Sequence, residues 1–198
     1  METFTLPKRF FKENPLEKLS AAAIFDFTLT LDESGGALDA MQDGLDPLLG
    51  EKRKEEIRRE QDQADAAGGP EEIVNAMRKI SNPFAVRILC GKALADQANV
   101  MPLLLRRYRT SSLDHFLETA ARCFCRGEAR WAEELLAAYP RIRDPYARSL
   151  ACLVFGERRM TEAAPLLLAE YRRLTADFPE RSLGQGPLLG LYILYGKP

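Results

Sequence analysis

The sequence predicts an all-α fold in which pairs of helices stack along the chain. Three copies of the pattern Leu-Leu-x-x-Tyr carry this prediction, and they end at Tyr108, Tyr139 and Tyr171, which are 31 and 32 residues apart. A less aromatic copy ends at Met77, 31 residues before Tyr108. A fixed period between about 20 and 50 residues is typical of stacked architectures, because each unit must bury its apolar face against its neighbours.

The composition is compatible with a core that needs neither a disulfide nor a metal. The chain has 198 residues, of which 46% are apolar, so it is long enough to bury such a core. No apolar run approaches the roughly 18 to 20 residues of a membrane span, and the first residues lack the apolar stretch of a signal peptide. A cytoplasmic protein is therefore expected.

The net charge of −1 hides a division between the two parts of the chain. Residues 1–69 hold 9 Lys or Arg against 15 Asp or Glu, a charge of −6, whereas residues 70–198 hold 19 against 14, a charge of +5. The basic part is expected either to dock the acidic one or to meet an anionic partner.

Residues 1–69 are expected to form a capping segment. Asn14-Pro15 suits a helix start, since asparagine caps the first turn and proline fits its first position. Apolar and polar residues alternate over 25–31, which is typical of a half-buried strand. A segment that is helical throughout is the alternative. The expected elements are a helix over 15–24, a strand over 25–31 with a hairpin partner over 3–6, and helices over 37–49 and 51–67.

The first 27 residues hold five of the ten phenylalanines, so the capping segment must bury itself. The first helix pair is the nearest apolar surface and is the expected partner. An exposed strand edge over 25–31 could also pair with the same strand of a second copy, which makes a homodimer through the N-terminal segment a further candidate.

Residues 70–198 are expected to form four helix pairs. Gly68-Gly69 interrupt the chain before Pro70, and Asn82-Pro83 and Asp144-Pro145 each combine a capping side chain with a proline at the first helical position. The glycines Gly127, Gly156 and Gly196 suit left-handed helix ends. The expected pairs are 70–80 with 83–95, 100–109 with 112–126, 129–139 with 144–156, and 162–175 with 186–195.

Residues that could carry out catalysis or bind a metal are sparse. Cys90, Cys123, Cys125 and Cys152 make no Cys-x-x-Cys spacing. Neighbouring helices should hold Cys123 and Cys152 too far apart for a relaxed disulfide, and buried free thiols are expected. His115 is the only histidine, which excludes a histidine pair within one chain, and it is expected at the surface. The sequence thus predicts a non-enzymatic protein with no catalytic residue, no cofactor and no metal.

The segment over 70–175 resembles the short HEAT-like repeats with a period near 31. The resemblance rests on Leu135-Leu136 followed by Asp144-Pro145-Tyr146-Ala147-Arg148, and more loosely on Asn82-Pro83-Phe84-Ala85-Val86-Arg87. It implies a right-handed α-α superhelix of about four helix pairs, in which Asp144 with Arg148, and Asn82 with Arg87, would help to bridge adjacent pairs. The 34-residue period of tetratricopeptide repeats is not found.

Arginines recur where the first helix of each pair ends, so stacking should align them along one edge. One interpretation is that they neutralise the helix C-termini, which is worth roughly 0.3 to 1 kcal/mol each. The other is that the row binds phosphates or an acidic protein. The candidate residues for an anionic partner are Arg106, Arg107, Arg109, Arg141, Arg143, Arg172 and Arg173.

The resemblance also bears on the partner. HEAT-like proteins offer long variable surfaces, so the leading expectation is a scaffold that binds a protein or peptide. One branch of the family holds duplex DNA in a basic groove near a tryptophan, which makes nucleic acid the second candidate partner. The single tryptophan, Trp131, is expected in the core here, because it shares a helix face with Leu135 and Tyr139.

Overall fold

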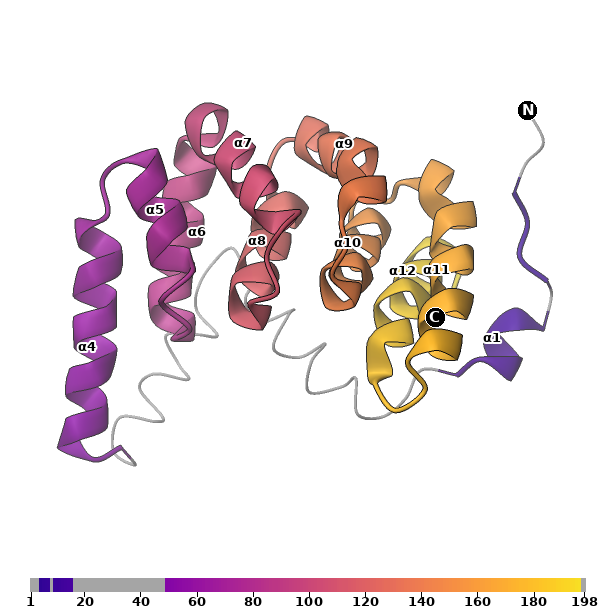
Figure 1. Ribbon diagram of the computed structural model, residues 1–198, viewed down its shortest axis with the longest axis horizontal. Helices are drawn as coiled ribbons and strands as arrows, with labels where there is room; N and C mark the ends of the chain where they lie inside the picture. The colour runs from indigo at the N-terminus through magenta and orange to yellow at the C-terminus, as the bar shows by residue number, and fades with distance from the viewer. Residues whose placement is uncertain (1–3, 8, 16–48, 197–198) are drawn as a thin grey trace.

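The computed structural model describes residues 4–7, 9–15 and 49–196, and all regular secondary structure in this part of the chain is helical (Figure 1). The α-helices are α1 (Phe10–Glu13), α4 (Glu51–Ala66), α5 (Pro70–Met77), α6 (Pro83–Ala95), α7 (Gln97–Tyr108), α8 (Asp114–Arg126), α9 (Ala129–Ala138), α10 (Pro145–Glu157), α11 (Ala164–Asp177) and α12 (Gln185–Tyr195). Short 3-10 turns, η2 (Tyr139–Arg141), η3 (Thr161–Ala163) and η4 (Ser182–Gly184), lie between them. The all-α prediction is confirmed.

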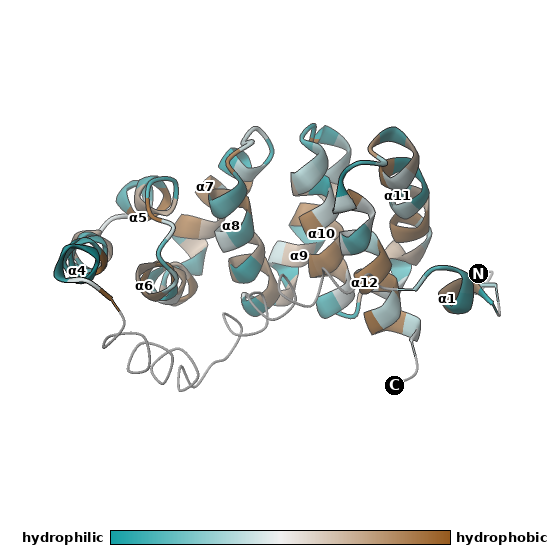
Figure 2. Ribbon diagram, turned by 90° about the horizontal axis from the view of Figure 1, so that it is seen from below, coloured by the Kyte–Doolittle hydropathy of each residue, from teal (hydrophilic) through white to brown (hydrophobic). Residues whose placement is uncertain are grey.

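The outcome differs for the expected elements of the N-terminal segment. The predicted strand over 25–31 and the helices over 15–24 and 37–49 fall wholly or almost wholly outside the described residues. Of the predicted strand partner over 3–6, residues 4–6 are described, and they have no regular structure. The predicted helix over 51–67 is α4, which is largely hydrophilic in Figure 2 and buries only Ala64, as a solvated helix would.

The proline start signals behave as expected. Asn82 Oδ1 accepts hydrogen bonds from the backbone N–H groups of Phe84 and Ala85, and Asp144 Oδ1 accepts one from Ala147. These side chains satisfy N–H groups that a first helical turn leaves without partners. The helix over 100–109 starts earlier than predicted, at Gln97, and contains Pro102 in its interior.

Helices that alternate along the chain pack side by side. One row consists of α4, α6, α8, α10 and α12, each of which contacts the next, and α5 packs against α7 on the other side. Each of α5, α7, α9 and α11 also contacts the helix that follows it. Figure 1 shows the helices arranged along the long axis from α4 to α11, with α12 between α10 and α11.

Recurring aromatic contacts fill the interior between paired helices. The rings of Tyr108 and Phe124 meet edge to face with centroids 5.6 Å apart, and those of Tyr139 and Phe155 do so at 5.8 Å. In both cases the phenylalanine follows its tyrosine by 16 residues. The third tyrosine of the pattern, Tyr171, instead meets Phe10 of the N-terminal segment, at 5.9 Å.

The N-terminal segment covers both ends of the helix array. Helix α4 packs on α6, where the Lys92 side chain donates to the carbonyls of Asp65 and Ala67. Residues 4–7 and 9–15 lie at the opposite end, against α11 and α12 (Figure 1). The expectation that the aromatic start of the chain packs on the first helix pair is therefore wrong for these residues, because the last pair offers tyrosines that no further helix pair covers.

The predicted glycine helix ends need a correction. Gly156 lies inside α10, Gly127 and Gly196 have negative φ, and the positive φ of 56° after α10 belongs to Arg159. Arg159 N–H donates to the Gly156 carbonyl and Met160 N–H to that of Phe155, which is the Schellman arrangement. Gly156 serves the packing of α10 on α12 instead.

Candidate functional site

Two turns of the chain form a groove with a volume of about 900 Å³. The first turn joins α7 to α8, and the second joins α9 to α10. Residues that line the groove are Arg109, Thr110, Ser111, Ser112, Pro140, Arg141, Arg143 and Asp144. Three of the seven arginines of the predicted row thus meet at one place.

Local packing explains why the second turn presents its arginines to solvent. Tyr139 and Ile142 are buried, whereas Arg141 and Arg143, which flank Ile142, are exposed. From within α10, Arg148 Nη1 donates to the Ile142 carbonyl at 3.1 Å and to that of Tyr139 at 3.4 Å. The buried side chains of Tyr139 and Ile142 therefore hold this turn so that Arg141 and Arg143 are left exposed.

The first turn is anchored in the same way. Tyr108 is fully buried, and its hydroxyl donates to the Ala147 carbonyl in α10 at 2.6 Å. Directly after it comes Arg109, whose Nε is buried without a hydrogen-bond partner. The Ser111 hydroxyl accepts from the Leu113 N–H, and the Thr110 hydroxyl donates to the Arg107 carbonyl.

The groove is positively charged. Among the described residues, Arg109, Arg141 and Arg143 form no ion pair. Asp144, the one acid in the lining, already uses Oδ1 to cap α10. Three guanidinium groups against one carboxylate leave a net excess of positive charge beside three hydroxyl side chains.

The other members of the predicted row lie outside the groove. Arg106 pairs with Glu71 of α5 at 3.4 Å, and Arg173 pairs with Glu170 at 2.9 Å. Arg172 is exposed, and Arg107 is partly buried with its Nε unpartnered. The seven arginines therefore divide into three that line the groove, two that pair with glutamates, and two that do neither.

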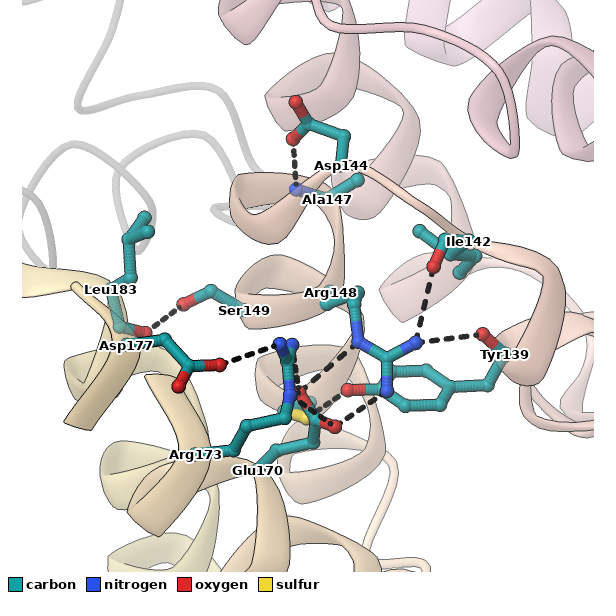
Figure 3. A network of polar contacts seen from close by, with 11 residues as sticks. Tyr139, Ile142, Asp144, Ala147, Arg148, Ser149, Glu170, Arg173, Asp177 and Leu183 are labelled. Atoms are coloured by element: carbon teal, nitrogen blue, oxygen red, sulfur yellow. Dashed lines mark hydrogen bonds and ion pairs between the residues drawn. The ribbon is translucent and has the colours of Figure 1, made fainter. Parts of the chain in front are cut away.

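Arg173 belongs to a network of hydrogen bonds and ion pairs around Glu170 (Figure 3). Glu170 is only 4% exposed and accepts hydrogen bonds from both Arg148 and Arg173. The Arg148 guanidinium also lies over the Tyr139 ring, 4.2 Å from its centroid, and Arg173 reaches Asp177 at 3.3 Å. Burial alone would raise the pKa of Glu170, but the hydrogen bonds from the two arginines outweigh it and hold the pKa at about 2.

This network revises the expected role of Arg148. The resemblance to HEAT-like repeats implied that Asp144 and Arg148 act together, but Asp144 caps α10 and Arg148 binds Glu170 of α11. Arg148 does connect successive helix pairs, through an acid that sequence reasoning missed. The only sequence signal for Glu170 is an acid on an otherwise apolar stretch of its helix, between Leu168 and Tyr171.

The remaining candidates are mostly structural. All four cysteines are free and buried, as predicted, and the sulfurs of Cys90 and Cys123 lie 3.6 Å apart. His115 is partly buried, with Nε2 3.0 Å from the Arg78 carbonyl, and Trp131 is in the core as expected. Across the part of the chain that the structure describes, there is no cluster of three or more His, Cys, Asp or Glu that could hold a metal.

Comparisons with models of protein families, with curated proteins and with solved structures give no match for this chain. Within the described ranges, no helix is both long and apolar enough to cross a membrane.

Proposed function

We propose that the protein is a non-enzymatic helical-repeat scaffold of the HEAT-like kind, which binds an acidic segment of a partner protein in the groove between the α7–α8 and α9–α10 turns. The observation that carries the proposal is the convergence of Arg109, Arg141 and Arg143, without acidic partners among the described residues, on one groove of about 900 Å³.

The repeat assignment draws on features that recur at the sequence period. The edge-to-face pairs of Tyr108 with Phe124 and of Tyr139 with Phe155 have the same spacing. Side-chain caps followed by proline begin α6 and α10, two helices of the same row. Equivalent contacts in successive units are what a repeat architecture requires, because each unit must present its neighbour with the same surface.

The chemistry of the groove favours carboxylates. Arginine offers a planar fork of N–H donors that matches a carboxylate in a bidentate manner. The Ser112 hydroxyl adds a short donor beside the guanidinium groups. An extended acidic peptide that crosses both turns would meet all three arginines.

A row that tracks a nucleic-acid backbone would need to extend along the array, since affinity rises with the number of phosphates that the protein neutralises. Arg106 and Arg173, which would extend the row on either side, already pair with Glu71 and Glu170. The interruption makes nucleic acid the weaker candidate and leaves it as an outcome of the binding experiment.

The experiment measures fluorescence anisotropy of a labelled oligoglutamate peptide with the full chain at low salt. We expect Arg141→Glu and Arg143→Glu each to weaken binding by about tenfold, since a hydrogen-bonded charge contributes about 1.5 to 3 kcal/mol. Arg172→Glu is the matched control, because it makes the same charge change at an exposed arginine outside the groove.

The outcomes separate the alternatives. Equal losses in Arg172→Glu and the groove variants would mean that diffuse charge, and not the groove, binds the peptide. Displacement of the peptide by oligothymidylate at lower concentration than by unlabelled oligoglutamate, with steep salt dependence, would replace the acidic peptide by nucleic acid. No binding of either probe at low salt would overturn the proposed site.

A further inference from the structure

The start of the chain is bound to the last helix pair as a peptide would be. The Phe10 ring meets Tyr171 edge to face at 5.9 Å, and the Phe11 ring lies 4.3 Å from that of Tyr192. Phe4 contacts Tyr195 in the same way, with centroids 6.2 Å apart. Phe10 is left only 6% exposed.

Hydrogen bonds add direction to these aromatic contacts. The Tyr192 hydroxyl donates to the backbone carbonyls of Phe11 and Asn14, at 3.0 and 3.1 Å. The Tyr171 hydroxyl donates to Asn14 Oδ1 at 2.7 Å, while Asn14 Nδ2 donates to the Phe10 carbonyl at 2.8 Å. Tyr192 and Tyr171 thus bind the backbone and the asparagine side chain of the segment, respectively.

The conformation of this segment depends on its binding surface. Helix α1 has four residues, and an isolated helix of that length does not persist in water. In the isolated segment water would solvate the carbonyls of Phe11 and Asn14, whereas here the Tyr192 hydroxyl donates to both. The segment is therefore ordered by binding, with recognition carried by the pattern Phe-Phe-x-x-Asn at residues 10–14.

The contacts described above join side chains of α11 and α12 to residues 4–14, and none of them requires both partners to belong to the same molecule. We propose that the face of α11 and α12 that binds this segment is also a docking site for the N-terminal segment of a second copy, so that two chains exchange these segments and form a dimer. At low concentration the segment of the same chain fills the site, because the covalent connection gives it a high effective concentration. Exchange of an identical element is a low-cost route to a dimer, since it uses contacts that already exist.

The inference is independent of the arginine groove, which lies between other helices. The sequence also made a homodimer a candidate, but through a different segment. The sequence pointed to a strand over 25–31, which lies outside the described residues, whereas the docked segment ends at Pro15.

The test uses two full-length variants that complement each other. Phe10→Ala/Phe11→Ala weakens the segment and keeps the docking face, and Tyr171→Phe/Tyr192→Phe removes the hydroxyls of the face and keeps the segment. By sedimentation velocity we expect each variant to be monomeric at a concentration where their equimolar mixture contains a heterodimer. Mixing Phe10→Ala/Phe11→Ala with the fourfold variant that carries all these changes provides the control, and it should stay monomeric.

A second measurement keeps the test decisive if the heterodimer is weak or a variant is unstable. A labelled peptide with the sequence of residues 1–15 should bind the Phe10→Ala/Phe11→Ala chain at least about tenfold more tightly than it binds the native chain, whose own segment occupies the face. A peptide carrying both alanines should not bind. Absence of a heterodimer at concentrations where this peptide saturates the variant, or equal binding of the two peptides, would overturn the proposal.

Discussion

Gly156 and Gly190 face each other where α10 crosses α12, so closely that a Cβ on Gly156 would lie 2.4 Å from the Gly190 Cα and 2.9 Å from its carbonyl oxygen. The obstacle is backbone and not a flexible side chain, so neither helix can give way locally. The absence of a side chain at both positions is what lets these two helices pack at their present distance.

Gly156→Ala is therefore expected to destabilise the chain. Overpacking costs about 1 to 3 kcal/mol in a rigid interior, and this backbone contact belongs at the upper end. Urea unfolding followed by circular dichroism measures the change. Gly91→Ala is the matched control, because Gly91 is exposed inside α6 with nothing within 4 Å of the added Cβ, and it should raise the free energy of unfolding by about 0.5 to 1 kcal/mol.

Glu170→Gln should lower the free energy of unfolding by about 2 to 3 kcal/mol at pH 7. The change removes the negative charge that two arginines share and leaves the half-buried Arg148 guanidinium without its acidic partner. Asp177→Asn, which touches only the exposed end of the same network, should cost less than about 0.5 kcal/mol. Equal effects of the two variants would contradict the central role given to Glu170.

The same carboxylate predicts a dependence of stability on pH. The pKa of Glu170 is about 2 in the folded chain against an ordinary value of 4.5, so its charge stabilises the folded state above pH 4.5. This contribution is lost progressively as the pH falls from 4.5 through 2. The difference in unfolding free energy between the native chain and Glu170→Gln should accordingly be constant from pH 5 to 7 and shrink between pH 4.5 and 2.

Tyr108→Phe should cost about 1 to 2 kcal/mol, because it leaves the buried Ala147 carbonyl without the hydroxyl that donates to it at 2.6 Å. Tyr139→Phe removes a hydroxyl that contacts only the Cys152 sulfur, at 3.4 Å, and sulfur is a weak partner. Its effect in the same urea unfolding experiment should be the smaller of the two. A larger loss for Tyr139→Phe would show that the hydroxyl of Tyr108 does not secure α7 to α10.

The four thiols should react slowly with Ellman's reagent in the folded chain. Burial raises the pKa of Cys152 to about 12, and the hydrogen bond with Cys90 together with burial raises that of Cys123. The thiolate is the nucleophile, so burial and a raised pKa both oppose reaction at Cys123 and Cys152. At Cys90 the hydrogen bond with Cys123 lowers the pKa, and burial alone opposes reaction. Adding guanidinium chloride should make all four reactive at once, and Gly91→Cys, with an exposed thiol, provides the fast reference.

Local chemistry was well predicted from the sequence. The caps at Asn82 and Asp144 depend only on residues two or three positions away, so the sequence determines them directly. The periodic tyrosines likewise predicted the helix pairs, because Tyr108 and Tyr139 must be buried wherever their helices pack. Trp131 and the four cysteines were expected in the interior for the same reason.

Features that depend on distant residues were missed. Glu71 lies 35 positions before Arg106, and Glu170 lies 22 after Arg148, so neither pairing can be found before the helices are placed. A glycine that ends a helix and one that permits close packing look alike in sequence, which explains the error at Gly156. The division of the arginine row follows from these same distant acids.

The binding of the N-terminal segment to α11 and α12 determines when this part of the fold can form during synthesis. The residues of this segment are translated before the face that binds them. Until α11 and α12 have been synthesised, Phe10 and Phe11 have no binding face within their own chain. The N-terminal segment can therefore bind within its own chain only after α11 and α12 have been translated.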